Sequence, residues 1–237
     1  MRVLELWRFP VKSLQGEQVG VAQFGAQGIE FDRRYAIFDA ATGYGLTARR
    51  VPEMLFASAR TSADGGVEIT LPDGVVAADD AALSEWLGRP VMLRSTEEVA
   101  ERRYENPDDI ETESKASWGS FAGAYGAFHD TQGATVTVLS TESMRGAATR
   151  RFRANIVVEG QGEDALVGQA VRVGGATLAI TIPIARCVMV TRAQPGDIDV
   201  DREVLRRIHR EFGGNLAVGG SVTGPGVARI GDDLTPV

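Results

Sequence analysis

Short runs of apolar residues, many of them alternating with polar ones, recur along most of this chain. They lie at residues 2–7, 35–40, 67–71, 91–95, 134–140, 154–160, 170–175, 176–185 and 187–191. Such runs are typical of strands in a sheet with one buried face. The 28 glycines fit the tight turns and bulges that would separate these strands. The pattern predicts a mainly β protein with barrel-like sheets.

Two segments instead show the spacing of a helix. Residues 79–88 begin with acidic residues, place Leu83, Trp86 and Leu87 on one side, and end at Gly88. The second helical segment covers residues 201–214. Its apolar face carries Val204, Leu205, Ile208 and Phe212, between an N-cap at Asp201 and a stop at Gly213. A shorter helix is expected after Thr141.

An acidic segment separates the two halves. Residues 97–113 carry eight carboxylates against two arginines, a composition that does not favour a core strand. We expect a surface excursion there, more as a solvated linker than as a lid or docking surface. The predicted organisation is an N-terminal barrel domain at 1–96, a linker at 97–119 and a second domain at 120–237.

Composition narrows the classes of function. A net charge of −7 argues against nucleic-acid binding, which needs a basic footprint. No apolar run approaches the ~20 residues that span a bilayer, so no membrane partner is expected. The first 14 residues lack the apolar run of a signal peptide, which makes a cytoplasmic location the default expectation.

The metal-binding residues are few. Cys187 is the only cysteine, and the chain has two histidines. These counts exclude an internal disulfide and argue against a cysteine-rich or histidine-rich metal site. A bound metal would therefore need a cofactor that brings most of its own ligands.

Cys187 itself allows two interpretations. A lone cysteine in an apolar run is most often a small buried hydrophobe. Arg186 precedes it, and a nearby guanidinium favours the thiolate, which is a nucleophile and a ligand for soft metals. Since neighbours in a strand point to opposite faces, Arg186 need not face the same pocket.

Polar residues near other predicted strand ends could bind an anion. Lys12 and Ser13 follow a proline-bent strand end, without the spacing of a P-loop, and Arg33 opens the strand near residue 35. Arg153 and Asn155 share one strand face. Three hydroxyls, those of Ser140, Thr141 and Ser143, lie where a strand enters the expected helix, whose N-terminus would attract an anion.

Taken in order, these segments resemble the MOSC-domain family. The resemblance rests on FPVKSLQG (9–16), DRRYAIFD (32–39), TARR (47–50), FRANIVVEG (152–160), ARCVMVT (185–191) and PGVARIGDDL (225–234). The first half is similar to the β-barrel domain that precedes MOSC in the mitochondrial amidoxime-reducing component and its bacterial relatives. The resemblance covers nearly the whole chain.

The resemblance implies a molybdenum–molybdopterin cofactor. It assigns Cys187 as the thiolate ligand of the metal and as the catalytic residue. The residues matched to cofactor binding are Lys12, Ser13, Arg33, Ser140, Thr141, Ser143, Arg153 and Asn155, with Arg186 added as the neighbour of the cysteine. The implied reaction is reduction of N-hydroxylated compounds such as amidoximes, hydroxylamines, hydroxamates and N-oxides.

Three departures from the family pattern are visible. Ala154 stands where relatives usually have proline, and Arg50 stands where they usually have glutamine. The cysteine cluster of relatives with a fused ferredoxin is absent, so electrons would come from a separate flavin or iron–sulfur protein. The alternatives are a module that carries or matures the cofactor without turnover, and a relative that has lost the cofactor.

Overall fold

The computed structural model describes residues 1–107 and 115–237, which form two compact units. The sheet unit contains Met1–Arg8, Glu17–Asp32 and Thr131–Val237, and the ribbon unit contains Phe9–Gly16 and Arg33–Asp130. The units therefore interleave along the chain, whereas contiguous domains at 1–96 and 120–237 were expected. The N-terminal strand causes this difference, because it pairs with a strand near residue 157. Part of the expected acidic linker, residues 108–113, lies outside the described residues.

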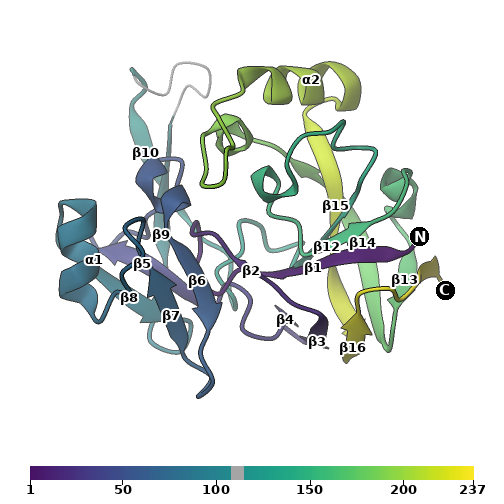
Figure 1. Ribbon diagram of the computed structural model, residues 1–237, viewed down its shortest axis with the longest axis horizontal. Helices are drawn as coiled ribbons and strands as arrows, with labels where there is room; N and C mark the ends of the chain where they lie inside the picture. Colours follow the sequence, from purple (N-terminus) through teal and green to yellow (C-terminus); the bar gives the residue numbers. More distant parts are fainter. Residues whose placement is uncertain (108–114) are drawn as a thin grey trace. The chain divides into compact units, whose positions relative to one another are not determined.

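The sheet unit is built around a curled, mainly antiparallel sheet (Figure 1). Its order is β17-β13-β14-β15-β11-β12-β1-β2, and only the β11–β12 pair is parallel among the pairings of the described residues. The strands are β1 (Val3–Arg8), β2 (Glu17–Gln18), β11 (Val136–Ser140), β12 (Ile156–Val158), β13 (Ala170–Val173), β14 (Ala176–Ala185), β15 (Asn215–Gly224) and β17 (Leu234–Pro236). A smaller sheet joins β16 (Gly226–Arg229), β3 (Val21–Gly25) and β4 (Gly28–Ile29).

Strand β15 was not predicted from the sequence, because glycines interrupt its apolar pattern. The structure explains one of them. A Cβ atom added to Gly220 would lie 1.9 Å from the carbonyl oxygen of Ala179 on the neighbouring strand β14. Only glycine permits such a close backbone approach. Gly220 thus interrupts the apolar pattern of β15 and is also required for the pairing of β14 with β15.

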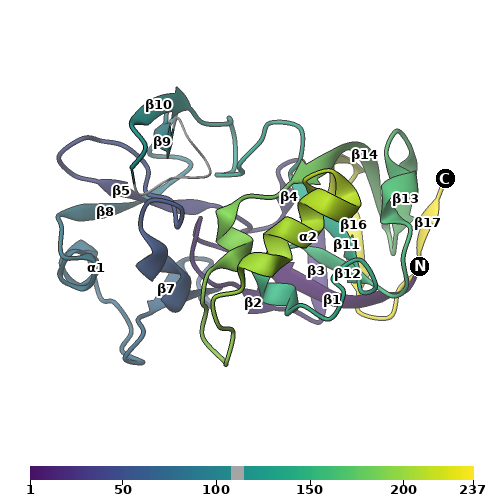
Figure 2. The same cartoon turned by 90° about the horizontal axis from the view of Figure 1, so that it is seen from above.

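Helix α2 (Arg202–Phe212) confirms the predicted second helix. The Asp201 side chain accepts a hydrogen bond from the Glu203 amide at 2.9 Å, and Gly213 ends the helix with φ 61°. Val204 and Ile208 are buried in one apolar cluster. The helix packs against β15 and against the short 3-10 helix η4 (Val188–Thr191). Figure 2 shows α2 from above, in front of strands of the sheet unit.

The short helix expected after Thr141 is not formed. Residues 141–146 make turns instead, and the next helical element is the 3-10 helix η2 (Thr149–Arg151). Two consecutive left-handed residues, Arg145 (φ 52°) and Gly146 (φ 79°), interrupt the helical path. A further 3-10 helix, η3 (Glu163–Leu166), follows β12.

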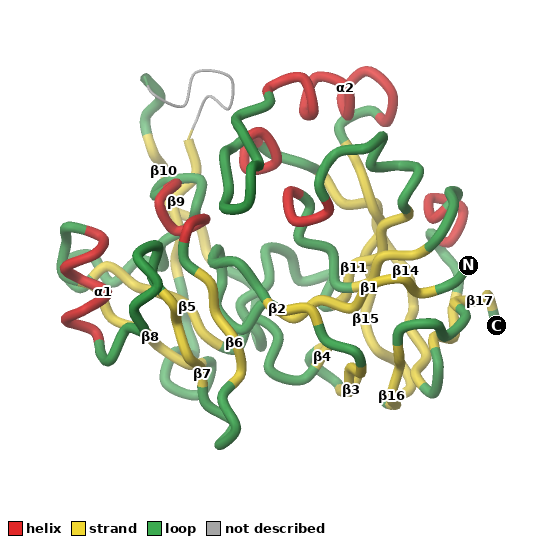
Figure 3. The backbone as a smooth tube through the Cα atoms, viewed as in Figure 1, coloured by secondary structure: helices red, strands yellow, loops and turns green. Residues whose placement is uncertain are grey.

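The ribbon unit consists of paired antiparallel strands with one α-helix. The pairs are β5 (Tyr35–Asp39) with β8 (Val91–Ser95), β6 (Ser58–Thr61) with β7 (Val67–Thr70), and β9 (Arg103–Pro107) with β10 (Trp118–Ala122). The 3-10 helix η1 (Pro52–Phe56) precedes β6, and α1 (Asp80–Leu87) precedes β8. In both units strands predominate over short helices (Figure 3), which confirms the mainly β prediction.

Strand β9 corrects the prediction for the acidic segment. Residues 103–107, expected in a surface excursion, pair with β10, and Tyr104 is only 2% exposed. The Tyr104 ring lies between two backbones. A Cβ atom would approach it to 2.2 Å at Gly45 and to 2.5 Å at Gly123. One buried aromatic side chain therefore holds this strand in the core despite its charged neighbours.

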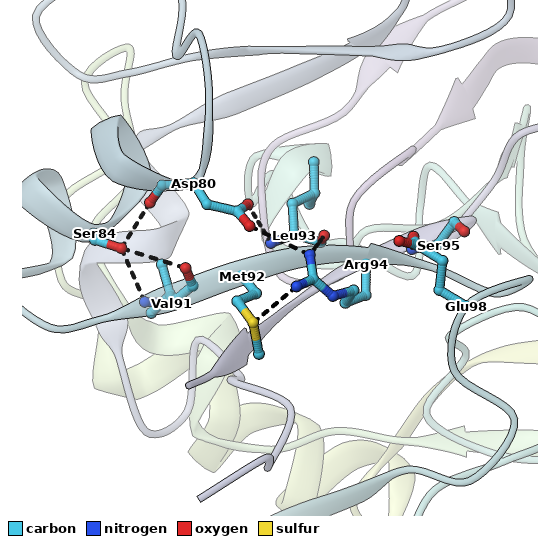
Figure 4. Close-up of polar contacts among 8 residues, drawn as sticks. All are labelled: Asp80, Ser84, Val91, Met92, Leu93, Arg94, Ser95 and Glu98. Carbon is cyan, nitrogen blue, oxygen red and sulfur yellow. Dashed lines mark hydrogen bonds and ion pairs between the residues drawn. The ribbon is translucent and has the colours of Figure 1, made fainter. Parts of the chain in front are cut away.

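Helix α1 confirms the other predicted helix and is tied to β8 (Figure 4). The Asp80 carboxylate accepts a hydrogen bond from the Leu93 amide at 2.8 Å, and Ser84 Oγ accepts one from the Val91 amide at 2.9 Å. These bonds supply β8 with partners on the side away from β5. Among the described helices, none is long and apolar enough to cross a membrane.

Candidate functional site

Cys187 lies where the long strand β14 ends. The residue is half-buried, its thiol is free, and it forms the N-cap of η4 with an extended backbone. Residues 187–191 were predicted to be a strand, which is wrong beyond Cys187. Val190 is instead buried in the α2 cluster, and its amide donates to the Cys187 carbonyl at 3.2 Å. Burial of Val190 against α2 thus favours a 3-10 turn over a strand here, and the Cys187 thiol lies where the strand gives way to this turn.

Arg186 faces the protein backbone. Its Nε donates to the Leu216 carbonyl at 2.7 Å, and its Nη1 donates to the Phe152 carbonyl at 2.7 Å. The guanidinium carbon lies 5.8 Å from the centre of the Phe152 ring. These contacts fix the chain directly before Cys187. We call residues 186–191 the thiol turn.

Arg153 combines partial burial with an unusual backbone. It follows η2 and Phe152 and has φ 52°. Ser13 (φ 72°) and Arg33 (φ 50°) share this left-handed conformation, which non-glycine residues seldom adopt. Backbone strain of this kind clusters at functional sites. Three residues assigned to cofactor binding by resemblance therefore carry a backbone feature that sequence analysis does not reveal.

Asn155 is buried in a network of its own unit. Its Oδ1 accepts hydrogen bonds from the amide and the hydroxyl of Thr137, at 3.2 and 3.1 Å. Its Nδ2 donates to the Trp7 carbonyl at 3.2 Å and to Asp32 at 3.1 Å. Asn155 is 1% exposed and Asp32 is 2% exposed. Both donors and both lone pairs of the amide are thus used to join β1, β11 and β12.

Ser140 and Ser143 are engaged with a carboxylate that sequence analysis did not identify. Ser140 Oγ donates to Glu163 at 2.5 Å, and Ser143 Oγ donates to the same oxygen at 3.0 Å. The Ser140 amide also donates to Glu163, at 3.2 Å. Ser140 is fully buried and Glu163 is 1% exposed. We call Ser140, Ser143 and Glu163 the serine cluster.

Thr141 is the half-buried neighbour of the serine cluster. Its hydroxyl accepts a hydrogen bond from the Gly160 amide at 3.1 Å, and its amide donates to the Val158 carbonyl at 2.9 Å. Thr141 therefore extends the β11–β12 pairing by one residue.

The ribbon unit holds the remaining candidates. Lys12 is 6% exposed, and its ammonium donates to the Phe128 carbonyl at 3.2 Å and pairs with Asp130. It also lies 5.0 Å from the centre of the Tyr104 ring. A lysine so buried differs from an ordinary solvated surface lysine.

Ser13 and Arg33 lie beside the same segment. The Ser13 hydroxyl is buried and accepts a hydrogen bond from the Ala48 amide at 3.0 Å. The half-buried Arg33 guanidinium stacks 4.6 Å from the centre of the Phe9 ring, and the Arg33 amide donates to the Phe9 carbonyl at 2.8 Å. Residues 9–13 and 33 are thus held as one structure within the ribbon unit.

The donor set fits an anionic cofactor that brings its own metal ligands. Within residues 1–107 and 115–237, no three histidine, cysteine, aspartate or glutamate side chains gather to hold a metal ion. The sheet unit offers one half-buried thiol at Cys187 and an arginine with a left-handed backbone at Arg153. The segments that carry them are joined by the hydrogen bond from Arg186 to the Phe152 carbonyl. A single soft ligand and cationic groups suit such a cofactor better than a bare ion.

Comparisons with solved structures returned distant matches of low similarity. The YuaD protein from Bacillus subtilis has 13% identity, with 98% of this chain and 93% of that chain covered and a TM-score of 0.44. YiiM from Geobacillus stearothermophilus has 16% identity, 59% and 74% coverage and a TM-score of 0.36. YiiM from Escherichia coli has 18% identity, 46% and 56% coverage and a TM-score of 0.35.

Comparison with curated protein sequences gave no match. Two family models match and together cover most of the chain. The MOSC N-terminal beta barrel domain matches residues 1–102, and the MOSC domain matches residues 123–235. Cys187, Arg153 and the serine cluster fall within the second match, and Lys12, Ser13 and Arg33 fall within the first. The chain therefore belongs to the MOSC family, with an N-terminal barrel domain followed by a MOSC domain.

Proposed function

We propose that this protein binds the molybdenum–molybdopterin cofactor and reduces N-hydroxylated compounds. The observation that carries the proposal is the position of Cys187 in the MOSC domain. Its thiol is free and half-buried at the end of a long core strand, on a turn braced on both sides by hydrogen bonds. A thiolate held in this way is a suitable ligand for a soft metal.

The other candidates would contribute charge and shape. In the sheet unit, Arg153 would offset the negative charge of the pterin phosphate, and Thr141 and Arg186 would support the backbone around it. In the ribbon unit, Lys12, Ser13 and Arg33 remain candidates for cofactor binding by resemblance to the family. The hydroxyls of Ser140 and Ser143 already donate to Glu163. We therefore assign the serine cluster and Asn155 a supporting role for the cofactor site.

When bound, the cofactor supplies a molybdenum centre that accepts the oxygen of the substrate and exchanges two electrons. For a hydroxylamine the overall reaction consumes two electrons and two protons and yields the amine and water. The chain has one cysteine, too few for an iron–sulfur cluster, so the electrons would come from outside these 237 residues. A flavin or iron–sulfur protein is the proposed donor.

The test combines metal analysis with a substitution. Protein from a molybdenum-replete host should contain about one molybdenum and one pterin per chain and should reduce an aryl amidoxime with a reduced viologen dye. Cys187→Ser should abolish reduction and leave the unfolding transition unchanged, because the side chain is half-buried and nearly isosteric. Undiminished reduction by this variant would refute the ligand assignment.

The same measurements separate the alternatives. Bound pterin and molybdenum without reduction of any N-hydroxylated substrate would favour a carrier or maturation module. Protein that contains neither, even after reconstitution, would exclude the proposal. Cys187→Ala serves as a second variant, since it removes the thiol without adding a hydroxyl.

A further inference from the structure

Arg151 is a buried arginine whose hydrogen bonds all reach one loop. The residue ends η2 and is 7% exposed. Its Nη1 donates to the carbonyls of Val190 and Arg192, both at 3.1 Å, and its Nη2 donates to the Asp199 carbonyl at 2.5 Å. These acceptors belong to the thiol turn and to the loop that leads from it to α2. One guanidinium thus fixes the chain that directly follows Cys187.

The chain that directly precedes Cys187 is fixed by the next residue of the same segment. The Phe152 carbonyl accepts the hydrogen bond from Arg186 Nη1 at 2.7 Å. Arg153, with its left-handed backbone, comes one residue later. Residues 151 and 152 are therefore bonded to the chain on both sides of Cys187, and they directly precede Arg153, which is assigned to cofactor binding by resemblance.

The choice of acceptors distinguishes this arrangement from an ordinary ion pair. Arg151 donates to backbone carbonyls at three points of the chain. Because the N–H donors of a guanidinium are fixed in one plane, all three bonds form only when the backbone follows one path. Burial lowers the pKa of Arg151, with the carboxylates of Asp201 and Asp199 acting against it. Burying a guanidinium costs free energy unless its donors are hydrogen-bonded. The loop must therefore keep the path that presents these carbonyls to Arg151.

The geometry points to Arg151 as a positioning residue that sets the place of the Cys187 thiol relative to Arg153. This inference rests on the proposed function for its consequence, since groups behind a metal ligand orient it. Without Arg151, Val190 would stay buried, but the chain after Cys187 would lose its hydrogen bonds to the guanidinium. The thiol would then sample more orientations.

The test measures the thiol itself, in metal-free protein of the full chain. Alkylation of Cys187 by iodoacetamide is followed across a pH series for the wild type, Arg151→Gln and Arg150→Gln. Arg150 is the matched control, because it lies in the same 3-10 helix and donates to the Pro195 carbonyl, further along the loop, whereas Arg151 bonds Val190 within the thiol turn and Arg192 directly after it. We expect about a tenfold faster alkylation for Arg151→Gln, which corresponds to ~1.4 kcal/mol. Arg150→Gln should stay close to the wild type.

The outcomes decide the inference separately from the proposed function. A lower thermal midpoint of Arg151→Gln with an unchanged alkylation rate and pH profile would show that Arg151 is merely structural. Should Arg151→Gln fail to fold, Arg151→Lys keeps the charge but replaces the planar fork, whose two Nη atoms bond different carbonyls, with a single ammonium, and it should show the same rise. A wild-type protein without molybdenum would refute the proposed function but would leave the alkylation result standing. In loaded protein, Arg151→Gln should lose pterin on gel filtration about 10–100-fold more readily.

Discussion

The serine cluster and the thiol turn both lie in the sheet unit, and both were expected to bind an anionic cofactor. In the serine cluster, the two hydroxyls and one amide donate to a buried carboxylate of the same unit. At the thiol turn, Arg186 donates to a carbonyl outside the turn and Arg151 donates to the Val190 carbonyl within it, while the thiol stays half-buried and free. The serine cluster satisfies its polar groups internally, whereas the polar groups at the thiol turn hold the segment that carries the thiol in place.

The two segments show that a residue at a position matched to the family can serve either the protein's own structure or a ligand. A serine or an asparagine at a matched position can be used entirely inside the protein, because its hydrogen-bonding groups are few and quickly satisfied. A cysteine has no comparable internal demand, so its exposure is informative. The cofactor assignment therefore depends mainly on the thiol turn, and the serine cluster is best interpreted as its scaffold.

Asn155, like the serine cluster, uses its polar groups inside the sheet unit, and its replacement should destabilise the protein most. Asn155→Ala removes bonds to Thr137, Trp7 and the buried carboxylate of Asp32. We expect a loss of about 3 kcal/mol in the free energy of unfolding, measured by urea denaturation. Cys187→Ala is the control and should cost less than ~1 kcal/mol. An Asn155 variant as stable as the wild type would mean that its amide serves a ligand instead.

A smaller effect is expected within the serine cluster. Both serine hydroxyls donate to one carboxylate oxygen of Glu163. Glu163→Gln turns one of the two carboxylate oxygens into an NH2 group, which donates two hydrogen bonds and leaves a single acceptor oxygen. Unfolding should become easier by about 2 kcal/mol. Glu159 lies shortly before Glu163 in the chain and is exposed. Glu159→Gln is therefore the matched control, and its free energy of unfolding should not change. If the cluster were instead an anion seat, Glu163→Gln would bind inorganic phosphate more tightly at little cost in stability.

Features set by nearby residues were predictable from the sequence. The N-cap of α2 at Asp201 and its end at Gly213 depend on residues within one turn, and both predictions are confirmed. The strands β11 and β14 were also predicted, since their apolar patterns are continuous.

Features that depend on distant residues were not predictable. The backbone approach at Gly220 is set by Ala179, and the conformation of η4 is set by burial of Val190 beneath α2. Glu163 meets Ser140 from 23 residues away. Its sequence neighbourhood is acidic and glycine-rich, with no pattern that indicates a buried carboxylate. Arg151 was overlooked for the same reason, because its three acceptors lie 39 to 48 residues further along the chain.

The smallest predicted effect tests the charge of the serine cluster. Partial desolvation of the Asp164 carboxyl, followed by the negative charge of Glu163, raises the pKa of Asp164 above its ordinary value. The unfolded chain therefore releases this proton first, and stability falls as the pH rises between the unfolded and the folded pKa. The loss then persists at neutral pH.

Asp164→Asn removes that loss, so at pH 7 it should be more stable than the wild type. The gain should be about 0.3 kcal/mol, because the residue is exposed and its charge is screened by solvent. It should vanish below pH ~3, where both states hold the proton. In a Glu163→Gln background the gain should shrink, since the second cause of the pKa shift is gone. A destabilised Asp164→Asn at pH 7 would contradict an anionic serine cluster. A confirmed gain would indicate that the field at the serine cluster repels phosphate, and the negative charge of the proposed cofactor would then be expected nearer to the arginines around the thiol turn.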